Sequence, residues 1–550
     1  MSTYHTLALV SLWSVAAFAA ANPLVVLREA SVQDAAAVRL AAAEAPDEAV
    51  AIMRGGSSAL ARSLESSEDP VLRLLPELAR ESCVPESVCP AAAVFYRQIQ
   101  SGAMTREQAK SIASSRADYF HHIVTLRMEG PDPLFDRVLH QEAETIRSAW
   151  MEGGEGRRSL GVERFSSRDL YAILAYGQRE ESEISFAKFF DLEFVPRMNG
   201  GRLMATLAAA KGLRVRHFLV EAIRADRVRQ LLDVAGSDRP RLVAQAVAGI
   251  GAAPKPEREC ALAAEVLEAY AELVSPGAIE KALLEESRRN EDLAGLLAAW
   301  LERLRSALMS KELTALAARY RRHLPEAGKL QAVDVCQDGV CTQRLMFFDD
   351  DDGAASFRAF QAQYRKDPSW TWEDHGGYVR VWRKGMAGLT VELFANRPQL
   401  NGGAVSMAWQ GKEQEAQAAF ARVLDARGMA RIFVQRGHAY HVPKAIEVVP
   451  HEARLVYLGG CRGTENLSNV LDRAPHAQII ATRSTGTMDV NDPLLKAMND
   501  ELADRGHIQW LDFWARQRSS FSGSHLFSRY IPPHRNGAVI VMQGWRRIHP

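Results

Sequence analysis

Two patterns of apolar residues divide the sequence into two regions. Between about residue 30 and residue 325, apolar residues recur with a spacing near 3.6, for example over 170–176 and 293–308, and Gly/Pro-containing breaks such as 252–256 interrupt them. This spacing places apolar side chains on one face of a helix. The sequence therefore predicts an all-α region over 22–327, arranged as a bundle or an irregular antiparallel array.

After residue 328, short apolar segments alternate with helical ones. Short and wholly apolar strands between helices are typical of a mainly parallel sheet covered by helices on both faces. We therefore expect an α/β domain over 328–550, with a sheet and helix extension at 328–411 and a core at 412–550. The predicted strands are 344–348, 378–382, 389–394, 431–434, 454–458, 478–481 and 538–542. The predicted helices are 356–364, 413–427, 443–449, 464–473, and one opened by Pro493, capped by Asn491 or Asp492 and closed by Gly506.

The first residues have the pattern of a secretion signal. An apolar run covers 7–20, small residues suited to cleavage lie at 17–21, and Asn22-Pro23 follows. This run is too short to cross a bilayer well and is typical of a signal peptide. The sequence predicts a signal peptide at 1–21 and an exported chain with no membrane span after its removal. An uncleaved apolar helix is the alternative.

The charge balance argues against one class of partner. Lys plus Arg and Asp plus Glu both total 67, so the formal net charge is zero. A neutral chain has no long-range field to attract nucleic acid or an anionic membrane surface. We therefore expect no nucleic-acid partner.

The six cysteines fit an oxidising compartment. Cys83 and Cys89 flank a proline, and Cys336 and Cys341 flank an Asp-Gly turn, so each pair can close a small disulfide loop. Neither pair has the two-residue spacing typical of structural zinc. Cys260 lies in an Ala/Leu-rich helical segment, which indicates a core residue.

Two predicted strands end in reactive residues. Segment 431–434 leads into Gln-Arg-Gly-His, with His438, and segment 454–458 leads into Gly-Gly-Cys-Arg-Gly, with Cys461. The helix between them makes a βαβ unit, whose strands are parallel and whose following loops open at one edge of the sheet. An imidazole beside a thiol can accept its proton and so activate it as a nucleophile. We predict a His438/Cys461 dyad, with backbone N–H groups at Ala439 and Gly460 stabilising an oxyanion.

The pattern of a strand ending in His and a later strand ending in Cys resembles the caspase, gingipain, legumain and separase group of cysteine peptidases. Gly460-Cys461-Arg462-Gly463 is similar to the caspase Ala-Cys-Arg-Gly segment. Residues 436–493 also resemble uncharacterised exported bacterial proteins that share Arg-Gly-His-x-Tyr-His, Gly-x-Cys-x-Gly and Val-Asn-Asp-Pro. Two departures are Ala439, where the peptidases usually have Gly, and the separation of 23 residues between His438 and Cys461, which is shorter than usual.

The resemblance implies a caspase-like fold and a bacterial cysteine endopeptidase that acts on a peptide or protein, with no cofactor and no metal. Together with the predicted signal peptide, it implies a periplasmic or extracellular location. Around the dyad, His441, Arg462 and Asp489 are the candidates for a second shell or a substrate pocket, with Asp489 suited to a basic side chain.

Three alternatives remain open at this point. His438, His441 and Cys461 could bind zinc, with a fourth ligand from His451, Asp489 or His534. The four aspartates at 349–352 could hold calcium, although a solvated turn that caps the next helix explains them as well. Finally, the chain could be a binding protein, in which a helical scaffold carries a catalytically silent caspase-like module and docks a protein partner.

Overall fold

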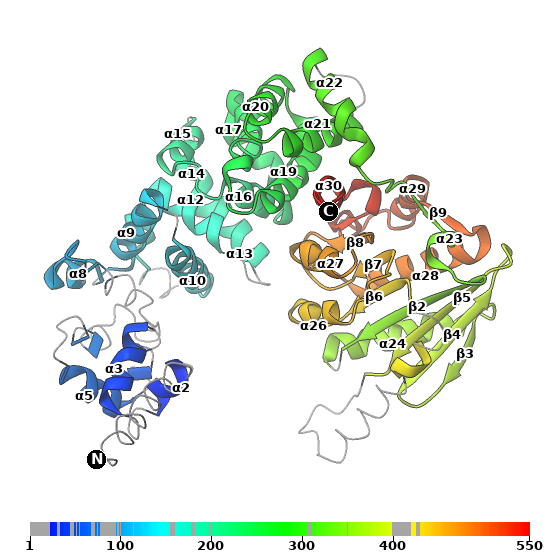
Figure 1. Cartoon of the computed structure of the whole chain (residues 1–550), viewed down its shortest axis with the longest axis horizontal. Coiled ribbons are helices and arrows are strands. Elements are labelled where there is room, and N and C mark those ends of the chain that lie inside the picture. Colours follow the sequence, from blue (N-terminus) through cyan, green and yellow to red (C-terminus); the bar gives the residue numbers. More distant parts are fainter. Residues whose placement is uncertain are drawn as a thin grey trace, which may run out of the picture. The chain divides into compact units, whose positions relative to one another are not determined.

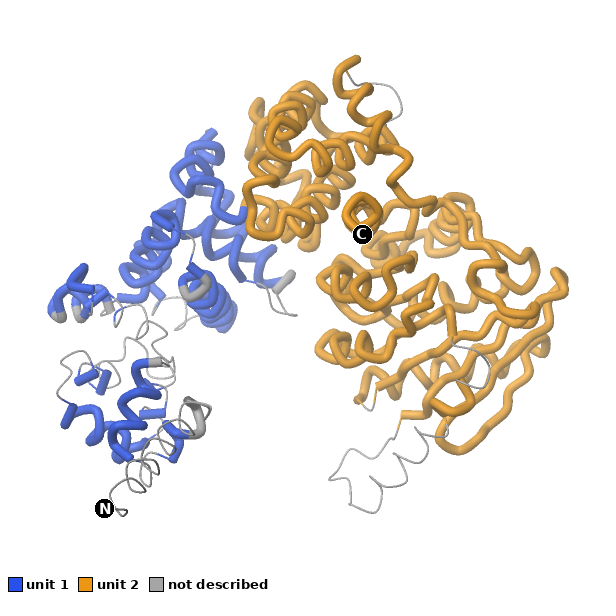
Figure 2. The backbone as a smooth tube through the Cα atoms, viewed as in Figure 1, with its two compact units in different colours: residues 1–214 blue, residues 215–550 orange. Residues whose placement is uncertain are grey.

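The computed structural model of the chain describes its second half almost continuously and its first 200 residues in pieces. The described residues are 23–29, 34–44, 49–50, 52–53, 56–67, 72–73, 75–76, 95, 98–99, 101–113, 115–130, 132–153, 160–177, 182–198, 201–305, 310–348, 350–398, 420–424 and 430–550. The predicted signal peptide 1–21, the pair Cys83 and Cys89, and most of the predicted helix 413–427 lie outside them. The chain divides into two compact units, residues 1–214 and residues 215–550 (Figure 2).

The first unit is helical throughout its described residues, as the sequence predicts. Ser166 shows why one helix starts where it does: its side chain accepts a hydrogen bond from the Asp169 N–H, and the Asp169 carboxylate accepts one from the Ser166 N–H. Reciprocal bonds of this kind satisfy the free donors at a helix start. The α-helices are α2 Pro23–Arg28, α3 Ala35–Glu44, α5 Ser58–Glu65, α8 Arg106–Ala113, α9 Arg116–Glu129, α10 Pro133–Met151, α12 Ser167–Tyr176, α13 Ser182–Phe189, α14 Val195–Met198 and α15 Arg202–Ala209.

The second unit begins with more helices, before its sheet (Figure 1). These are α16 Val215–Arg224, α17 Val228–Ala235, α18 Arg239–Ala244, α19 Pro256–Tyr270, α20 Gly277–Ser287, α21 Glu291–Arg305 and α22 Lys311–Tyr320. They belong with the sheet because the last helix of the chain, α30 Gly537–Ile548, packs against α19 and α21. The approach is close, since a Cβ added at Gly537 would come within 2.6 Å of the Trp300 indole nitrogen. The boundary between the compact units therefore falls inside the region predicted as one helical array.

A mixed eight-stranded sheet occupies the rest of this unit. Its order is β10-β8-β7-β6-β2-β5-β4-β3. The central strands β5, β2, β6, β7 and β8 are parallel, and β10, β4 and β3 pair antiparallel at the two sides. The strands are β2 Val340–Phe347, β3 Thr371–Asp374, β4 Tyr378–Lys384, β5 Thr390–Asn396, β6 Ile432–Arg436, β7 Leu455–Leu458, β8 Gln478–Thr482 and β10 Tyr530–Ile531; β1 Lys329–Gln331 and β9 His507–Gln509 form a separate pair.

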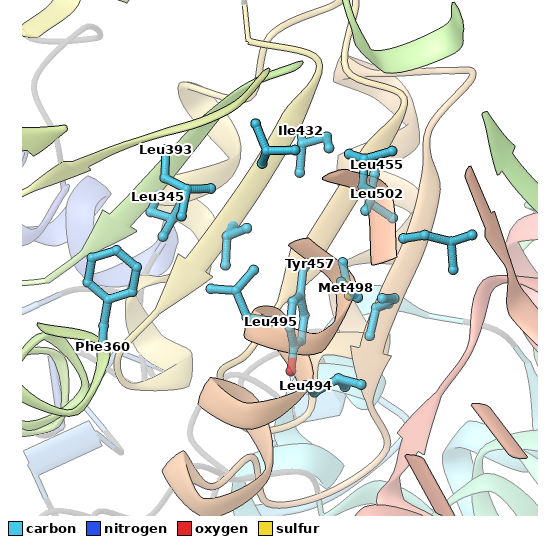
Figure 3. Packing of buried hydrophobic residues seen from close by; sticks show 14 of the residues in the cluster. Leu345, Phe360, Leu393, Ile432, Leu455, Tyr457, Leu494, Leu495, Met498 and Leu502 are labelled. Atoms are coloured by element: carbon cyan, nitrogen blue, oxygen red, sulfur yellow. The ribbon is translucent and has the colours of Figure 1, made fainter. Parts of the chain in front are cut away.

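Helices cover both faces of the sheet. One face packs against α24 Asp351–Lys366, α28 Met488–Arg505 and α29 Trp510–Ser520, and the other against α26 Val442–Glu447, α27 Leu467–Arg473 and α30. Successive strand residues point to opposite faces. Accordingly Tyr457 packs with Leu495 on the α28 side (Figure 3), whereas its neighbours Val456 and Leu458 join the other core. Two apolar layers therefore bury the central strands β6 and β7 completely.

Two predicted elements are wrong. Segment 538–542 is not a strand but part of α30, which Asn536 caps through a bond from the Val539 N–H. A short apolar run buried on all sides looks the same in sequence whether it is a strand or a helix. The helix assigned to start at Pro493 begins instead at Met488, and Pro493 lies inside it. The other described strand and helix assignments after residue 328 hold within a few residues, while the edge strands β3 and β10 were not predicted.

The cysteines occupy three environments. Cys336 and Cys341 form a disulfide between the end of α23 Ala332–Val335 and β2. Cys260 is a free thiol buried in α19, and Cys461 is a free thiol that is partly exposed. Among the helices described here, none is long and apolar enough to cross a membrane.

Candidate active site

The candidate site lies at the carboxyl ends of β2, β6 and β7. The strands β3, β4 and β5, which follow β2 in sequence, lie on one side of β2, with β5 next to it. The later strands β6, β7 and β8 lie on its other side. The point where the strand order reverses, between β2 and β6, is where open parallel sheets bind ligands. Three segments meet there: the acidic turn Asp350–Asp352 after β2, the loop Gly437–His441 after β6, and the loop Gly459–Gly463 after β7.

One buried amide joins the loops of His438 and Cys461. The Gln435 side chain, fully buried at the end of β6, donates from Nε2 to the Gly437 carbonyl at 3.3 Å and accepts at Oε1 from the Gly460 N–H at 3.0 Å. Gly437 directly precedes His438, and Gly460 directly precedes Cys461. The two loops are therefore neighbours on one edge, as the βαβ topology predicts.

Further bonds hold the backbone that precedes Cys461. The Thr482 hydroxyl donates to the Gly460 carbonyl at 2.6 Å, and Asn491 Nδ2 donates to the Gly459 carbonyl at 2.8 Å. Both donors are buried. Buried polar groups that are fully bonded make a segment rigid. Cys461 thus stands on a backbone with little freedom to move.

Arg462, next to the thiol, is part of this buried framework. Its side chain is 2% exposed, and its guanidinium pairs with Glu221 of α16 at 3.0 Å and with Glu465. Its N–H donates to the Ser484 carbonyl at 2.7 Å. The structure therefore gives Arg462 a position inside the protein, and its side chain does not line an open pocket.

Tyr530 is the titratable neighbour of Cys461 on β10. Burial raises the pKa of Tyr530 to about 12, against the opposing effects of its bonds with Thr487 and the charge of Arg436, and the nearby Cys461 thiol raises it further. By contrast, Cys260 is sealed in an apolar helix, where burial raises the pKa of its thiol far above the usual range. A buried, inert thiol and a partly exposed one therefore coexist in this unit.

The His438 ring lies against the acidic turn. Its Nε2 is 3.1 Å from Asp351 Oδ1 and its Nδ1 is 3.2 Å from Asp352 Oδ2. Burial lowers the pKa of His438, but the hydrogen bond to Asp351 and the charges of Asp352, Asp350 and Asp351 outweigh it, so that the pKa is raised. The same bond lowers the pKa of Asp351. In this arrangement both ring nitrogens face carboxylates, which favour the protonated form of His438.

His441 also contacts the acidic turn, through Asp350. Its Nε2 is 3.0 Å from Asp350 Oδ2, and its ring stacks on Phe348 with centroids 4.2 Å apart. Asp350 in turn caps α24 through a bond from the Gly353 N–H. The aspartates are thus the helix-capping turn that the sequence suggests, with histidines added by the tertiary fold.

The turn also brings together donors that suit a cation. Ligand atoms of Asp350, Asp351 and His438 lie within 4.8 Å of one another, and no other such group of three occurs among the described residues. These residues could hold a divalent cation. The zinc site considered from sequence is not assembled, because Cys461 does not belong to this group. His451 precedes β7 and therefore lies at the other end of the strands, where its ring bonds the Arg473 carbonyl.

A buried ion pair beneath the site was not anticipated from sequence. Arg436, the last residue of β6, pairs with Asp492 of α28 at 2.7 Å, and both side chains are almost fully buried. Burial raises the pKa of Asp492 despite the charge of Arg436. Asp492 and its neighbour Asn491, assigned from sequence as helix caps, instead bind β6 and the loop after β7. A signal in the sequence was that Arg436 and Asp492 lie in two of the three segments, 436–441 and 490–493, that resemble segments of the uncharacterised exported proteins.

The remaining site candidates fall into three places. The Gly460 N–H, expected to bind an oxyanion, is already bonded to Gln435, whereas the structure shows no such bond for the Ala439 N–H among the described residues. Asp489 is exposed in the first turn of α28 and not in the loop after β8. Tyr440, beside His438, is 58% exposed and lies at the rim.

A pocket of about 250 Å³ lies elsewhere, near the amino ends of β6 and β7. Its lining is apolar with basic groups at its margin, and it includes Arg344, Val449, His451 and Arg473. Of the residues considered for the site only His451, an alternative zinc ligand, contributes to this lining, and His438 and Cys461 do not.

Comparisons of the chain with protein-family models, with curated proteins and with solved structures find no match.

Proposed function

We propose that this chain is an exported cysteine hydrolase of the caspase and gingipain type that cleaves peptide bonds with Cys461 as its nucleophile. The observation that carries the proposal is the Gln435 amide, which ties the residue before His438 to the residue before Cys461 on adjacent parallel strands. A preformed edge that carries a partly exposed thiol on one loop and an imidazole on the neighbouring loop suits acyl transfer.

The reaction would run through an acyl-enzyme. The Cys461 thiolate attacks the carbonyl carbon of the scissile bond, and the electron pair moves to the oxygen, which the Ala439 N–H would stabilise. Collapse of this intermediate breaks the C–N bond, and the His438 imidazolium gives its proton to the leaving amine. Water, deprotonated by the now neutral ring, then hydrolyses the thioester and releases the acid and the free thiol.

The His438 ring must exchange one partner for this chemistry. Its contact with Asp351 is the one that breaks most readily, because the Asp351 side chain is 90% exposed and exposed ion pairs contribute little stability. Asp352, at 55% exposure, can keep its contact with Nδ1 while Nε2 turns away. The arrangement in the structure is then a resting orientation of the ring.

Export belongs to the same proposal. The apolar run at 7–20 with its small residues predicts a cleaved leader, and the Cys336–Cys341 disulfide suits an oxidising compartment. The peptide or protein substrate would then be met in the periplasm or outside a bacterial cell.

Site-specific alkylation tests the proposal. We expect iodoacetamide to label Cys461 faster than an ordinary exposed thiol, and His438→Ala to slow this labelling, with peptide mass spectrometry separating Cys461 from the other cysteines. Cys461→Ala should abolish hydrolysis of a mixed peptide library that the natural chain cleaves. The proposal would be contradicted if Cys461 is labelled at the same rate in the natural chain and in His438→Ala, and if the natural chain does not cleave the library.

One observation favours a second candidate, a catalytically silent module that binds a protein partner. Both nitrogens of His438 are held by carboxylates in this structure, so neither is available to accept the proton of the thiol. If that orientation is permanent, only the scaffold remains useful. The same alkylation experiment separates the two, because a silent module predicts slow labelling of Cys461 that His438→Ala leaves unchanged.

A further inference from the structure

A buried chain of charges links the helical part of the second unit to the residue after Cys461. Glu221 of α16 and Arg462 are 241 positions apart in sequence, yet Glu221 Oε1 lies 3.0 Å from the Arg462 guanidinium. The two side chains are only 1% and 2% exposed. Charges so deeply buried require a close partner of opposite sign.

Two further residues complete the network. Arg224, one turn after Glu221 on α16, donates to Glu221 at 2.6 Å and to Glu465 at 3.0 Å, and Glu465 also pairs with Arg462. Two guanidinium groups and two carboxylates therefore alternate around one point. The charge of Glu265 also acts on Arg224. Removal of Glu221 takes from Arg462 a carboxylate partner that is itself almost fully buried.

The backbone of Arg462 adopts a conformation that is uncommon for an arginine. Its φ of +53° lies in the left-handed region, which glycine adopts most readily and other residues adopt at a cost. Glycines stand on both sides of the Cys461–Arg462 pair, at Gly460 and Gly463. An arginine in such a conformation is held by its ionic partners, and the strained turn places Cys461 directly before it.

We infer that Glu221 is a positioning residue of the Cys461 site, acting through Arg462 to fix the loop on which the thiol stands. The helices α16–α22 are then part of the site and not only a scaffold beside it. This inference rests on the proposed function for its chemical meaning, but the positioning itself can be measured without any catalysis.

Hydrogen exchange in the full-length chain tests the inference. We expect Glu221→Gln and Arg462→Gly to lower the protection of segment 459–466 by about tenfold or more, the factor that loss of a hydrogen bond to a charged group implies. Glycine suits the left-handed backbone at position 462 but also gives the loop more freedom, so Glu221→Gln, which leaves the sequence of the loop unchanged, is the decisive variant. The matched control is Asp233→Asn on α17, where the same charge is removed from a carboxylate that is 73% exposed.

A second readout separates positioning from general stability. Iodoacetamide labelling of Cys461 should slow in Glu221→Gln and Arg462→Gly and should recover partly in Glu221→Asp and Arg462→Lys, which keep the charges. If Glu221→Gln fails to fold, Arg462→Asn decides the question, because asparagine tolerates the left-handed backbone and lacks the guanidinium: faster exchange of 459–466 in this variant supports the inference.

The opposite result overturns it. Exchange of 459–466 and labelling of Cys461 at the rates of the natural chain, in a folded Arg462→Gly variant, would show that the ionic network does not position the loop. Failure of the proposed hydrolase gives a different result: Cys461 is labelled at the same rate in the natural chain and in His438→Ala, whatever the exchange experiment shows.

Discussion

The loops after β6 and β7 are neighbours on one sheet edge, but they are held in opposite ways. The loop that carries Cys461 is fixed through its backbone, by buried donors such as Gln435 and Thr482. The ring of His438 is fixed through its side chain, by carboxylates that stand in solvent on α24. Buried, fully bonded groups resist displacement, whereas exposed ion pairs contribute little. The thiol therefore has a set position and the imidazole has freedom to turn toward it.

The largest expected effect comes from the buried pair beneath both loops. Asp492→Ala leaves Arg436 charged and without its partner in the core, which should lower the free energy of unfolding by about 3–5 kcal/mol. Urea denaturation of the full chain measures this. The paired change Arg436→Met with Asp492→Leu should recover much of the loss, and a single change with no effect would show that the pair is unimportant.

A smaller effect is expected from the amide that joins the loops. Gln435→Ala leaves the Gly460 N–H buried without an acceptor, a loss of about 1–3 kcal/mol. Exchange of the Gly460 amide should quicken, and Cys461 alkylation should slow. Thr482→Val, which removes the donor to the Gly460 carbonyl while keeping the volume of the side chain, is a companion variant that should act in the same direction.

The exposed carboxylates should behave differently. Asp351→Asn should leave the midpoint of urea unfolding unchanged, because the Asp351 side chain is almost wholly in solvent. Its effect should appear instead in the rate of Cys461 alkylation, which should rise if the contact restrains the ring. A clearly lower midpoint of urea unfolding in Asp351→Asn would show that the exposed contact of His438 does contribute to stability, against the contrast drawn between the two loops.

The titration of His438 gives a finer measure. Its pKa is raised in the folded chain, so the ionic contribution to stability is present below the ordinary pKa of histidine and is lost as pH rises through the folded value. NMR titration of the ring should show a midpoint above 6.5, and Asp351→Asn and Asp352→Asn should each lower it. A midpoint at or below 6.5 in the natural chain would contradict the geometry of the acidic turn.

The smallest expected effect is that of metal removal. If His438 serves Cys461, treatment with a chelator should leave Cys461 labelling and peptide cleavage unchanged. Activity that is lost with the chelator and restored by one divalent cation would instead assign Asp350, Asp351 and His438 to a metal site.

The edge itself could be predicted from sequence because the βαβ pattern is local. Two apolar strands with a helix of few residues between them have only one favoured arrangement, so adjacency of the His438 and Cys461 loops follows without coordinates. What could not be predicted is the direction of the His438 ring, since Asp351 and Asp352 come from a helix some 90 residues earlier that only the strand order places beside β6. The buried pair of Arg436 and Asp492 was missed for the same reason.

Local periodicity alone determined that the chain starts with helices and ends with a layered sheet whose parallel strands present a histidine and a cysteine. Tertiary structure decided which charges meet. Glu221 reaches Arg462 and Asp352 reaches His438 across long stretches of chain. Hydrophobic spacing repeats within a few residues and can be read along the chain, but an ion pair depends on where whole elements pack, and no local pattern records that.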